Sequence, residues 1–213
     1  MSISHHPGDE LLLSYASGAA SEAVALIVAA HTTFCAACRA TLAHAEAAGG
    51  SLLRDVAPVS MSSTAYESIL SRLDEPAREV VKAAHLQSDV PAPLQPYIGT
   101  DYDALPWRHV AGGISHLPIR TKGGMKVRLI RAEPGSGVYT HTHRGEEWTL
   151  VLTGSYTDKT GHYATGDLQS TTPEVVHRPT ADAGPVCINL AVTDAPLVFR
   201  GLMPKLVAKF HGF

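Results

Sequence analysis

Apolar residues in the first third of the chain recur with the period of an α-helix. One predicted helix, beginning near Ser21, has an apolar face at positions i, i+3, i+4 and i+7: Val24, Ile27, Val28 and His31. The helix before it begins near Asp9 and ends at Gly18, because glycine readily adopts the left-handed conformation that closes a helix. A third helix begins near Phe34 and stops at the glycine pair of residues 49–50. These helices predict a small N-terminal bundle.

Two shorter helices are predicted after a loop over residues 51–63. Thr64 and Glu67 have the spacing of a capping box, in which two side chains satisfy the free N–H groups of a helix start. The helix that they open has apolar residues on one face: Tyr66, Ile69, Leu70 and Leu73. A further short helix is expected after Asp74, because Pro76 fits the first turn of a helix.

Beyond about residue 106 the pattern changes to the two-residue alternation of β-strands. Alternating runs cover residues 125–130, 148–152 and 186–192, and Gly, Pro, Asp and Thr separate them. Residues 197–199 could form a last strand or pack on the others. The stretch before the strands contains prolines 91, 93, 96 and 106, which should prevent regular structure and form a semi-rigid linker.

The helical period of the first part and the strand alternation of the second predict an α+β protein of two domains. A helical domain occupies residues 1–85, a Pro-rich linker residues 86–106, and an antiparallel β-barrel domain with a C-terminal tail residues 107–213. A chain of 213 residues has room for two small domains of this kind.

Composition and charge exclude several classes of function. The chain is 45% hydrophobic and 17% charged, which is the balance of a soluble globular protein. Its 17 basic and 20 acidic residues give no broad positive surface, which disfavours direct nucleic-acid binding. The N-terminus lacks the basic and apolar regions of a signal peptide, and the longest apolar run, residues 23–30, is shorter than the ~20 residues of a membrane span. We therefore expect a cytoplasmic protein without a disulfide framework.

The first group of potential metal ligands has the spacing H-x3-C-x2-C, at His31, Cys35 and Cys38. On a helix, positions i, i+4 and i+7 point the same way. Two cysteines separated by two residues can bind one tetrahedral Zn²⁺ with both thiolates. The fourth ligand should come from elsewhere, and His6 is the first candidate with His5 as its rival.

Two other interpretations of these cysteines stand beside the zinc site. A C-x-x-C pair can be a redox centre, although no thioredoxin-like βαβ pattern surrounds this one. Cys35 and Cys38 could also be buried apolar residues, with His31 as a core histidine. Zinc is favoured because a bundle of short helices has a small core, and bound zinc contributes folding free energy directly.

A histidine near the N-terminus followed by H-x3-C-x2-C in a short helical domain resembles the zinc-binding anti-sigma factors. The resemblance rests on His6, His31, Cys35 and Cys38. It implies that the helical domain holds an alternative sigma factor inactive.

Another group of potential metal ligands lies in the β region. It matches cupin motif 1, G-(x5)-H-x-H-(x3)-E-(x6)-G, without a gap. The matching residues are Gly135, His141, His143, Glu147 and Gly154. Histidines at i and i+2 of a strand face the same side, so both can offer an imidazole to one metal. Glu147 begins the next strand and adds a carboxylate.

A later segment supplies a fourth barrel ligand, His177, preceded by the Gly-Asp pair of residues 166–167. It departs from the second cupin motif, since Pro173 comes one residue late, Glu174 replaces a glycine and Ala181 replaces an asparagine. Three histidines and one glutamate suit Zn, Mn, Fe or Ni, so the ligands do not choose the metal. The alternative is that the paired histidines are exposed strand residues.

The two motifs in this order resemble the ChrR-type anti-sigma factors over nearly the whole chain. The resemblance implies that residues 1–85 bind an extracytoplasmic-function sigma factor. It also implies that the cupin domain is needed for the response to oxidative stress, namely singlet oxygen, and that no residue is catalytic. The alternative is a cupin metalloenzyme, a dioxygenase or isomerase, with a helical interaction domain. Its metal would keep a coordination position open for substrate.

Overall fold

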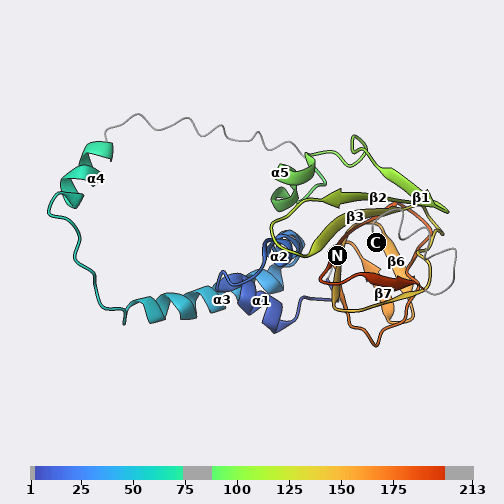
Figure 1. Cartoon of the computed structure of the whole chain (residues 1–213), viewed down its shortest axis with the longest axis horizontal. Coiled ribbons are helices and arrows are strands. Elements are labelled where there is room, and N and C mark those ends of the chain that lie inside the picture. Colours follow the sequence, from blue (N-terminus) through green and yellow to red (C-terminus); the bar gives the residue numbers. More distant parts are fainter. Residues whose placement is uncertain (1–2, 74–87, 200–213) are drawn as a thin grey trace.

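The computed structural model describes residues 3–73 and 88–199 and confirms the α+β class. Helices make up the N-terminal part and antiparallel strands the C-terminal part (Figure 1). Among the described residues, no helix combines the length and apolar character that crossing a membrane requires.

Four helices form the N-terminal part: α1 (Asp9–Ala16), α2 (Glu22–Phe34), α3 (Ala36–Leu53) and α4 (Ala65–Leu73). Gly18 follows α1 with a φ of 73°, a value that favours glycine. Ser21 caps α2, because its hydroxyl accepts a hydrogen bond from the N–H of Val24 at 3.3 Å. Between α2 and α3 only Cys35 is non-helical, with ψ at 107°, so the chain turns sharply at a predicted zinc ligand.

The glycine pair of residues 49–50 does not end α3, which continues to Leu53. The predicted end of the helix and start of the loop are therefore wrong. Neither glycine has a positive φ, and a glycine inside a helix costs only about 1 kcal/mol relative to alanine. The cap of α1 is Gly8, and Asp9 is its first helical residue. The helix predicted after Asp74 lies outside the described residues.

The Pro-rich stretch has more structure than predicted. It contains η1 (Ala92–Leu94), a turn of 3₁₀-helix, and α5 (Gln95–Ile98), and each has a proline in its first turn. Proline is tolerated there because the first N–H groups of a helix have no intrahelical partner. Val90 and Leu94 are buried in the same core as α2. The segment is thus packed against the helices, while the domain boundaries stay a prediction.

Antiparallel strands form three sheets that together enclose an interior cavity, without joining into one closed cylinder. The largest sheet has the order β1-β2-β3-β10-β5-β8, and the smaller sheets are β11-β4 and β7-β6-β9. The strands are β1 (Arg108–Ala111), β2 (Ile114–Ile119), β3 (Lys126–Ala132), β4 (His141–His143), β5 (Glu147–Thr153), β6 (Ser155–Asp158), β7 (Gly161–Ala164), β8 (Leu168–Thr171), β9 (Thr180–Ala181), β10 (Cys187–Thr193) and β11 (Leu197–Phe199). The alternating runs of the sequence correspond to β3, β5 and β10, and residues 197–199 form the last strand.

The core of the helices continues into the outer face of the large sheet. Every residue of β10 is buried, and α2 packs against β5 and β10. Ile188, Leu190 and Val192 of β10 belong to the same cluster of buried apolar residues as Ile27 of α2. Cys187 belongs to a second cluster on the barrel side of the sheet. One face of β10 therefore packs on the helices and the other lines the barrel.

Candidate metal sites

The four residues predicted to bind zinc meet at one point in the N-terminal part. His6 precedes α1, His31 lies in the last turn of α2, and Cys38 in the first turn of α3. The Nδ1 atom of His6 is 3.3 Å from Sγ of Cys35 and 3.4 Å from Sγ of Cys38. The Nε2 atom of His31 is 3.3 Å from Sγ of Cys38. The four ligand atoms lie within 4.8 Å of one another.

Buried surroundings keep His31 neutral and oppose thiolate formation when no cation is near. Burial lowers the pKa of His31 to about 4, and its Nδ1–H donates to the carbonyl of Gly166 at 2.9 Å. The lone pair on Nε2 therefore points at the cysteines. Burial, with the neighbouring Cys35, raises the pKa of the Cys38 thiol to about 12. A bound cation would reverse that shift, and Cys₂His₂ is one of the donor sets that bind structural zinc tetrahedrally.

Of the two N-terminal histidines, the structure brings His6 and not His5 to the cysteines. The ring of His5 lies 4.4 Å from that of Tyr163, between centroids, and its Nδ1 is 3.6 Å from Oδ1 of Asp167. His5 therefore faces the barrel while the next residue faces the cysteines.

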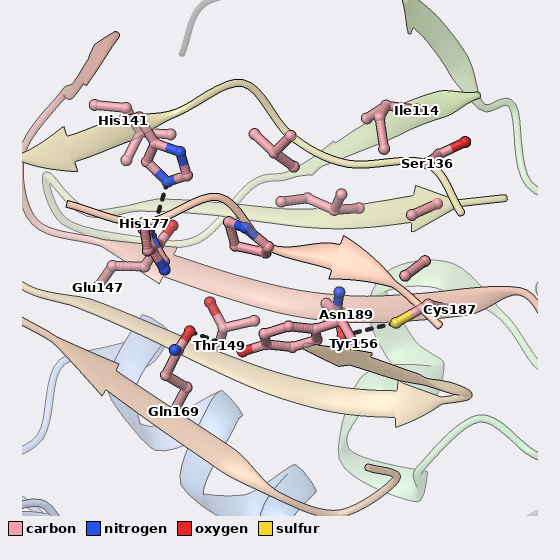
Figure 2. Close-up of a pocket in the computed structure, with 16 residues that line it drawn as sticks. Ile114, Ser136, His141, Glu147, Thr149, Tyr156, Gln169, His177, Cys187 and Asn189 are labelled. Carbon is pink, nitrogen blue, oxygen red and sulfur yellow. Dashed lines mark hydrogen bonds between the residues drawn. The ribbon is translucent and has the colours of Figure 1, made fainter. Parts of the chain in front are cut away.

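The four barrel residues also converge, from three separate segments. His141 and His143 lie on β4, and Glu147 begins β5. His177 is paired with His141 through two backbone hydrogen bonds, of 3.1 and 3.0 Å, which place the two side chains together (Figure 2). All four residues are buried, and their ligand atoms lie within 4.8 Å of one another. The departures from the second cupin motif thus leave His177 in place.

The hydrogen bonds of these histidines direct two ring nitrogens toward one point, where a cation fits. The Nδ1–H of His141 donates to the carbonyl of Tyr139 at 2.8 Å, and that of His177 donates to Asp158 at 2.7 Å. The Nε2 atoms of these two rings are then lone-pair acceptors, yet they lie 3.0 Å apart. Burial, together with the neighbouring His177, lowers the pKa of His141 to about 3, which disfavours a positive charge on that ring. A divalent metal ion between the rings would accept both lone pairs.

Two further groups at this point fit a metal. Nε2 of His143 lies 3.1 Å from Nε2 of His177, while its Nδ1 is buried without a hydrogen-bond partner, 3.6 Å from a carboxylate oxygen of Glu147. Burial raises the pKa of Glu147 to about 7, against the opposing effects of His177 and Arg128. A cation would restore the carboxylate. Three histidines and a carboxylate fit several divalent transition metals.

Sequence reasoning missed the polar residues behind His177. Asp158, at the end of β6, accepts hydrogen bonds from His177 and from Nε2 of Gln169, the latter at 2.9 Å. Burial alone would raise the pKa of Asp158, but the bonds from His177, Thr160 and Gln169 outweigh it and hold the pKa below its usual range. Gln169 in turn accepts from the hydroxyl of Tyr156 at 2.8 Å. A carboxylate behind a ligating histidine is common, but only the fold shows which carboxylate it is.

A cavity of about 50 Å³ lies beside the barrel ligands. His141, Glu147 and His177 line one end of it, while Ile114 and Cys187 lie toward the other (Figure 2). Cys187 is fully buried, and its thiol donates to Oδ1 of Asn189 at 3.6 Å.

Comparison with known proteins places the chain in a family. Residues 96–195 match the ChrR cupin-like domain. All four barrel ligand candidates lie within this range. Over 210 residues, covering 99% of both chains, the sequence is 40% identical to the anti-sigma-E factor ChrR of Cereibacter sphaeroides. The chain belongs to the ChrR family. A crystal structure of Rhodobacter sphaeroides SigE in complex with the anti-sigma factor ChrR matches 91% of this chain and 100% of that one, at 38% identity and a TM-score of 0.80. The match to ChrR therefore covers the helical part as well as the cupin-like domain.

Proposed function

We propose that this protein is an anti-sigma factor that binds an extracytoplasmic-function sigma factor and keeps it from RNA polymerase. The observation that carries the proposal is the full-length match to ChrR, which was crystallised with SigE. Because sigma factors act on RNA polymerase, the proposed function also implies a cytoplasmic protein.

An exposed apolar surface on the helical part supports a protein partner. No residue of α4 is buried against the described part of the chain, although the helix is amphipathic. Its apolar face is exposed: Tyr66, Ile69, Leu70 and Leu73. Figure 1 shows α3 and α4 extending away from the barrel. An amphipathic helix that leaves its apolar face in water is suited to a groove of another protein.

The apolar surface continues onto α1 and the end of α3. Leu12 is buried whereas Leu13 is 57% exposed, so the leucine run of α1 serves both the core and the surface. Leu52 and Leu53 at the end of α3 are exposed as well. Several segments of the helical part therefore present apolar side chains that a sigma factor could cover.

We infer that the N-terminal cluster holds zinc with a structural role. His6, His31, Cys35 and Cys38 would tie the segment before α1 to the junction of α2 and α3. Bound zinc contributes its binding free energy to the folding of such small units.

We further propose that His141, His143, Glu147 and His177 hold zinc or another divalent transition metal, and that the barrel is needed to release the sigma factor under oxidative stress. The signal, singlet oxygen, follows from the resemblance of the two motifs to ChrR-type proteins. Asp158 would orient His177 toward that metal.

The deciding experiment is co-expression with each extracytoplasmic-function sigma factor of the same organism, followed by pull-down and transcription by RNA polymerase. We expect a stable complex and repressed transcription. Absence of a complex would refute the proposed function. Metal-dependent turnover of a small molecule in that case would favour the cupin enzyme.

A further inference from the structure

The turn between β7 and β8 connects the barrel to the segment that carries His6. Oδ1 of Asp167 accepts hydrogen bonds from the backbone N–H groups of Ser4, at 2.7 Å, and His5, at 2.9 Å. Its Oδ2 accepts from the N–H of Ala164 at 2.9 Å, which fixes the carboxylate in the turn. The N–H of Leu168 donates to the carbonyl of His5 at 3.1 Å. The backbone leading to His6 is thus held by three hydrogen bonds to the barrel.

Gly166, in the same turn, contacts the second histidine of the N-terminal site. Its carbonyl accepts the Nδ1–H of His31 at 2.9 Å. Its φ is +94°, and a Cβ here would overlap the side chain of Ile3 and lie 3.0 Å from Cβ of Phe34. Only glycine allows so close an approach, and the approach brings the carbonyl to the ring.

The negative charge of Asp167 strengthens its hydrogen bonds to the N-terminal segment. Asp167 is only 5% exposed. Burial alone would raise its pKa, but hydrogen bonds from Ala164, His5 and Ser4 outweigh burial and lower it. The carboxylate is therefore ionised at neutral pH, and hydrogen bonds to an ionised acceptor are roughly twice as strong as neutral ones.

The strand that follows the turn also reaches the barrel metal site. Gln169, two residues after Asp167, donates to the same oxygen of Asp158 that accepts from His177. Residues 166–169 therefore contact the surroundings of both candidate metal sites. A shift of β8 would be transmitted to both.

We propose that the β7–β8 turn completes the N-terminal metal site from the barrel side, with Asp167 and Gly166 as positioning residues. Gly166 fixes the tautomer and orientation of His31, so that Nε2 points at the metal. Asp167 fixes the backbone that presents His6. Metal retention at the N-terminal site then depends on the barrel. The consequence for sigma binding rests on the proposed function, whereas the claim about metal retention does not.

Cobalt substitution in the full chain tests this directly. A Co²⁺–thiolate absorption band reports only on the N-terminal site, since the barrel candidates contain no sulfur ligand. Changes behind metal ligands typically lower metal affinity about 10–100-fold, and we expect Asp167→Asn to lose Co²⁺ to a chelator about that much faster than the wild type. Asp182→Asn is the matched control, because this carboxylate also accepts bonds within the barrel, from Ser155 and Thr157. An unchanged rate in Asp167→Asn overturns the proposal, as does an equal increase in Asp182→Asn.

A second variant keeps the test valid if circular dichroism shows that Asp167→Asn disturbs the barrel. Ser4→Pro removes one N–H donor to Asp167 from the other side and leaves every barrel residue unchanged. We expect faster Co²⁺ loss here too, and a double variant no faster than the faster single one, because both act through one contact. A wild-type rate for Ser4→Pro, or multiplied effects in the double variant, contradicts the proposal.

Sigma binding by the wild type is measured separately. Its absence alongside faster Co²⁺ loss in both variants would refute the proposed function and leave this inference standing.

Discussion

The same arrangement of residues recurs at both candidate metal sites. In each, a histidine donates its Nδ1–H to a protein oxygen, which leaves Nε2 as a lone-pair donor facing the centre. The pairs are His31 with the carbonyl of Gly166, His141 with that of Tyr139, and His177 with the carboxylate of Asp158. Such partners set ring orientation and ligand basicity.

Sequence spacing located the eight candidate ligands but not these partners. H-x3-C-x2-C and H-x-H-x3-E are local patterns, so strand and helix geometry alone bring most of their members together. His177 needed only the family distance from residues 166–167. Asp158 ends β6 and is part of no motif, and it meets His177 only because β6 and the segment after β8 enclose the same cavity.

Exchanging the two N-terminal histidines separately tests the ligand assignment. His6→Ala should release about one metal ion per chain and lower the melting temperature, because a structural zinc in zinc-finger peptides binds with roughly 10–16 kcal/mol. His5→Ala should retain the metal, since the ring of His5 faces Tyr163. Elemental analysis and thermal unfolding give both answers. The reverse order of metal loss would show that the cluster has been misassigned.

Asp158 gives a prediction for the barrel site. Asp158→Asn should weaken metal binding at His141, His143, Glu147 and His177 by about 10–100-fold, because the ring of His177 loses its charged acceptor. Competition with a chromogenic chelator measures the change. Asp103→Asn, in an exposed loop, is the control. Equal affinities in the two variants would rule out a role for Asp158.

Single elements show where local rules were overridden. The predicted helix stop at residues 49–50 failed because two glycines weaken a helix without needing to break it. The prolines of residues 91–96 begin helical turns, because Leu94 gains a buried position beside α2. In the first case only the end of a predicted helix was wrong, whereas in the second no helix had been predicted.

Helix α4 carries a prediction about the partner. Ile69→Glu or Leu70→Glu should each weaken sigma binding by roughly 10–100-fold, if burial of one such side chain contributes about 1.5–3 kcal/mol. Ser71→Glu, on the same helix but outside its apolar face, is the matched control. Fluorescence anisotropy with labelled sigma factor provides the affinities. Wild-type binding by both apolar-face variants would exclude this face from the interface.

For the whole molecule, the sequence predicted two domains, and the structure adds a core that runs between them. Residues such as Ile27 and Leu190 are far apart along the chain but share one apolar cluster. Alternation along β10 could not reveal this, because the pattern indicates a strand with one apolar face but not which element packs against that face. The order of a helical part followed by an antiparallel β part was nevertheless predicted correctly.

A test in cells can separate the proposed roles of the helical part, sigma inhibition, and of the barrel, the response to singlet oxygen. Replacing His141, His143, Glu147 or His177 by Ala should leave sigma inhibition intact and abolish induction by singlet oxygen, because the exposed helical surface is unaltered. A sigma-dependent reporter, with and without a photosensitiser in light, measures both properties. Normal induction in all four variants would remove the barrel metal from the response.

The hydrogen bond between His31 and Gly166 joins residues 135 positions apart, and this separation sets an order of events during synthesis. All four N-terminal ligands have left the ribosome long before the turn that steadies them. At about 5–20 residues per second, the delay is roughly 7–30 s. A nascent chain therefore passes through a period in which all four residues of its proposed N-terminal zinc site have been made but the turn that contacts His31 has not. The newest copies in a cell should be the ones that exchange zinc most freely.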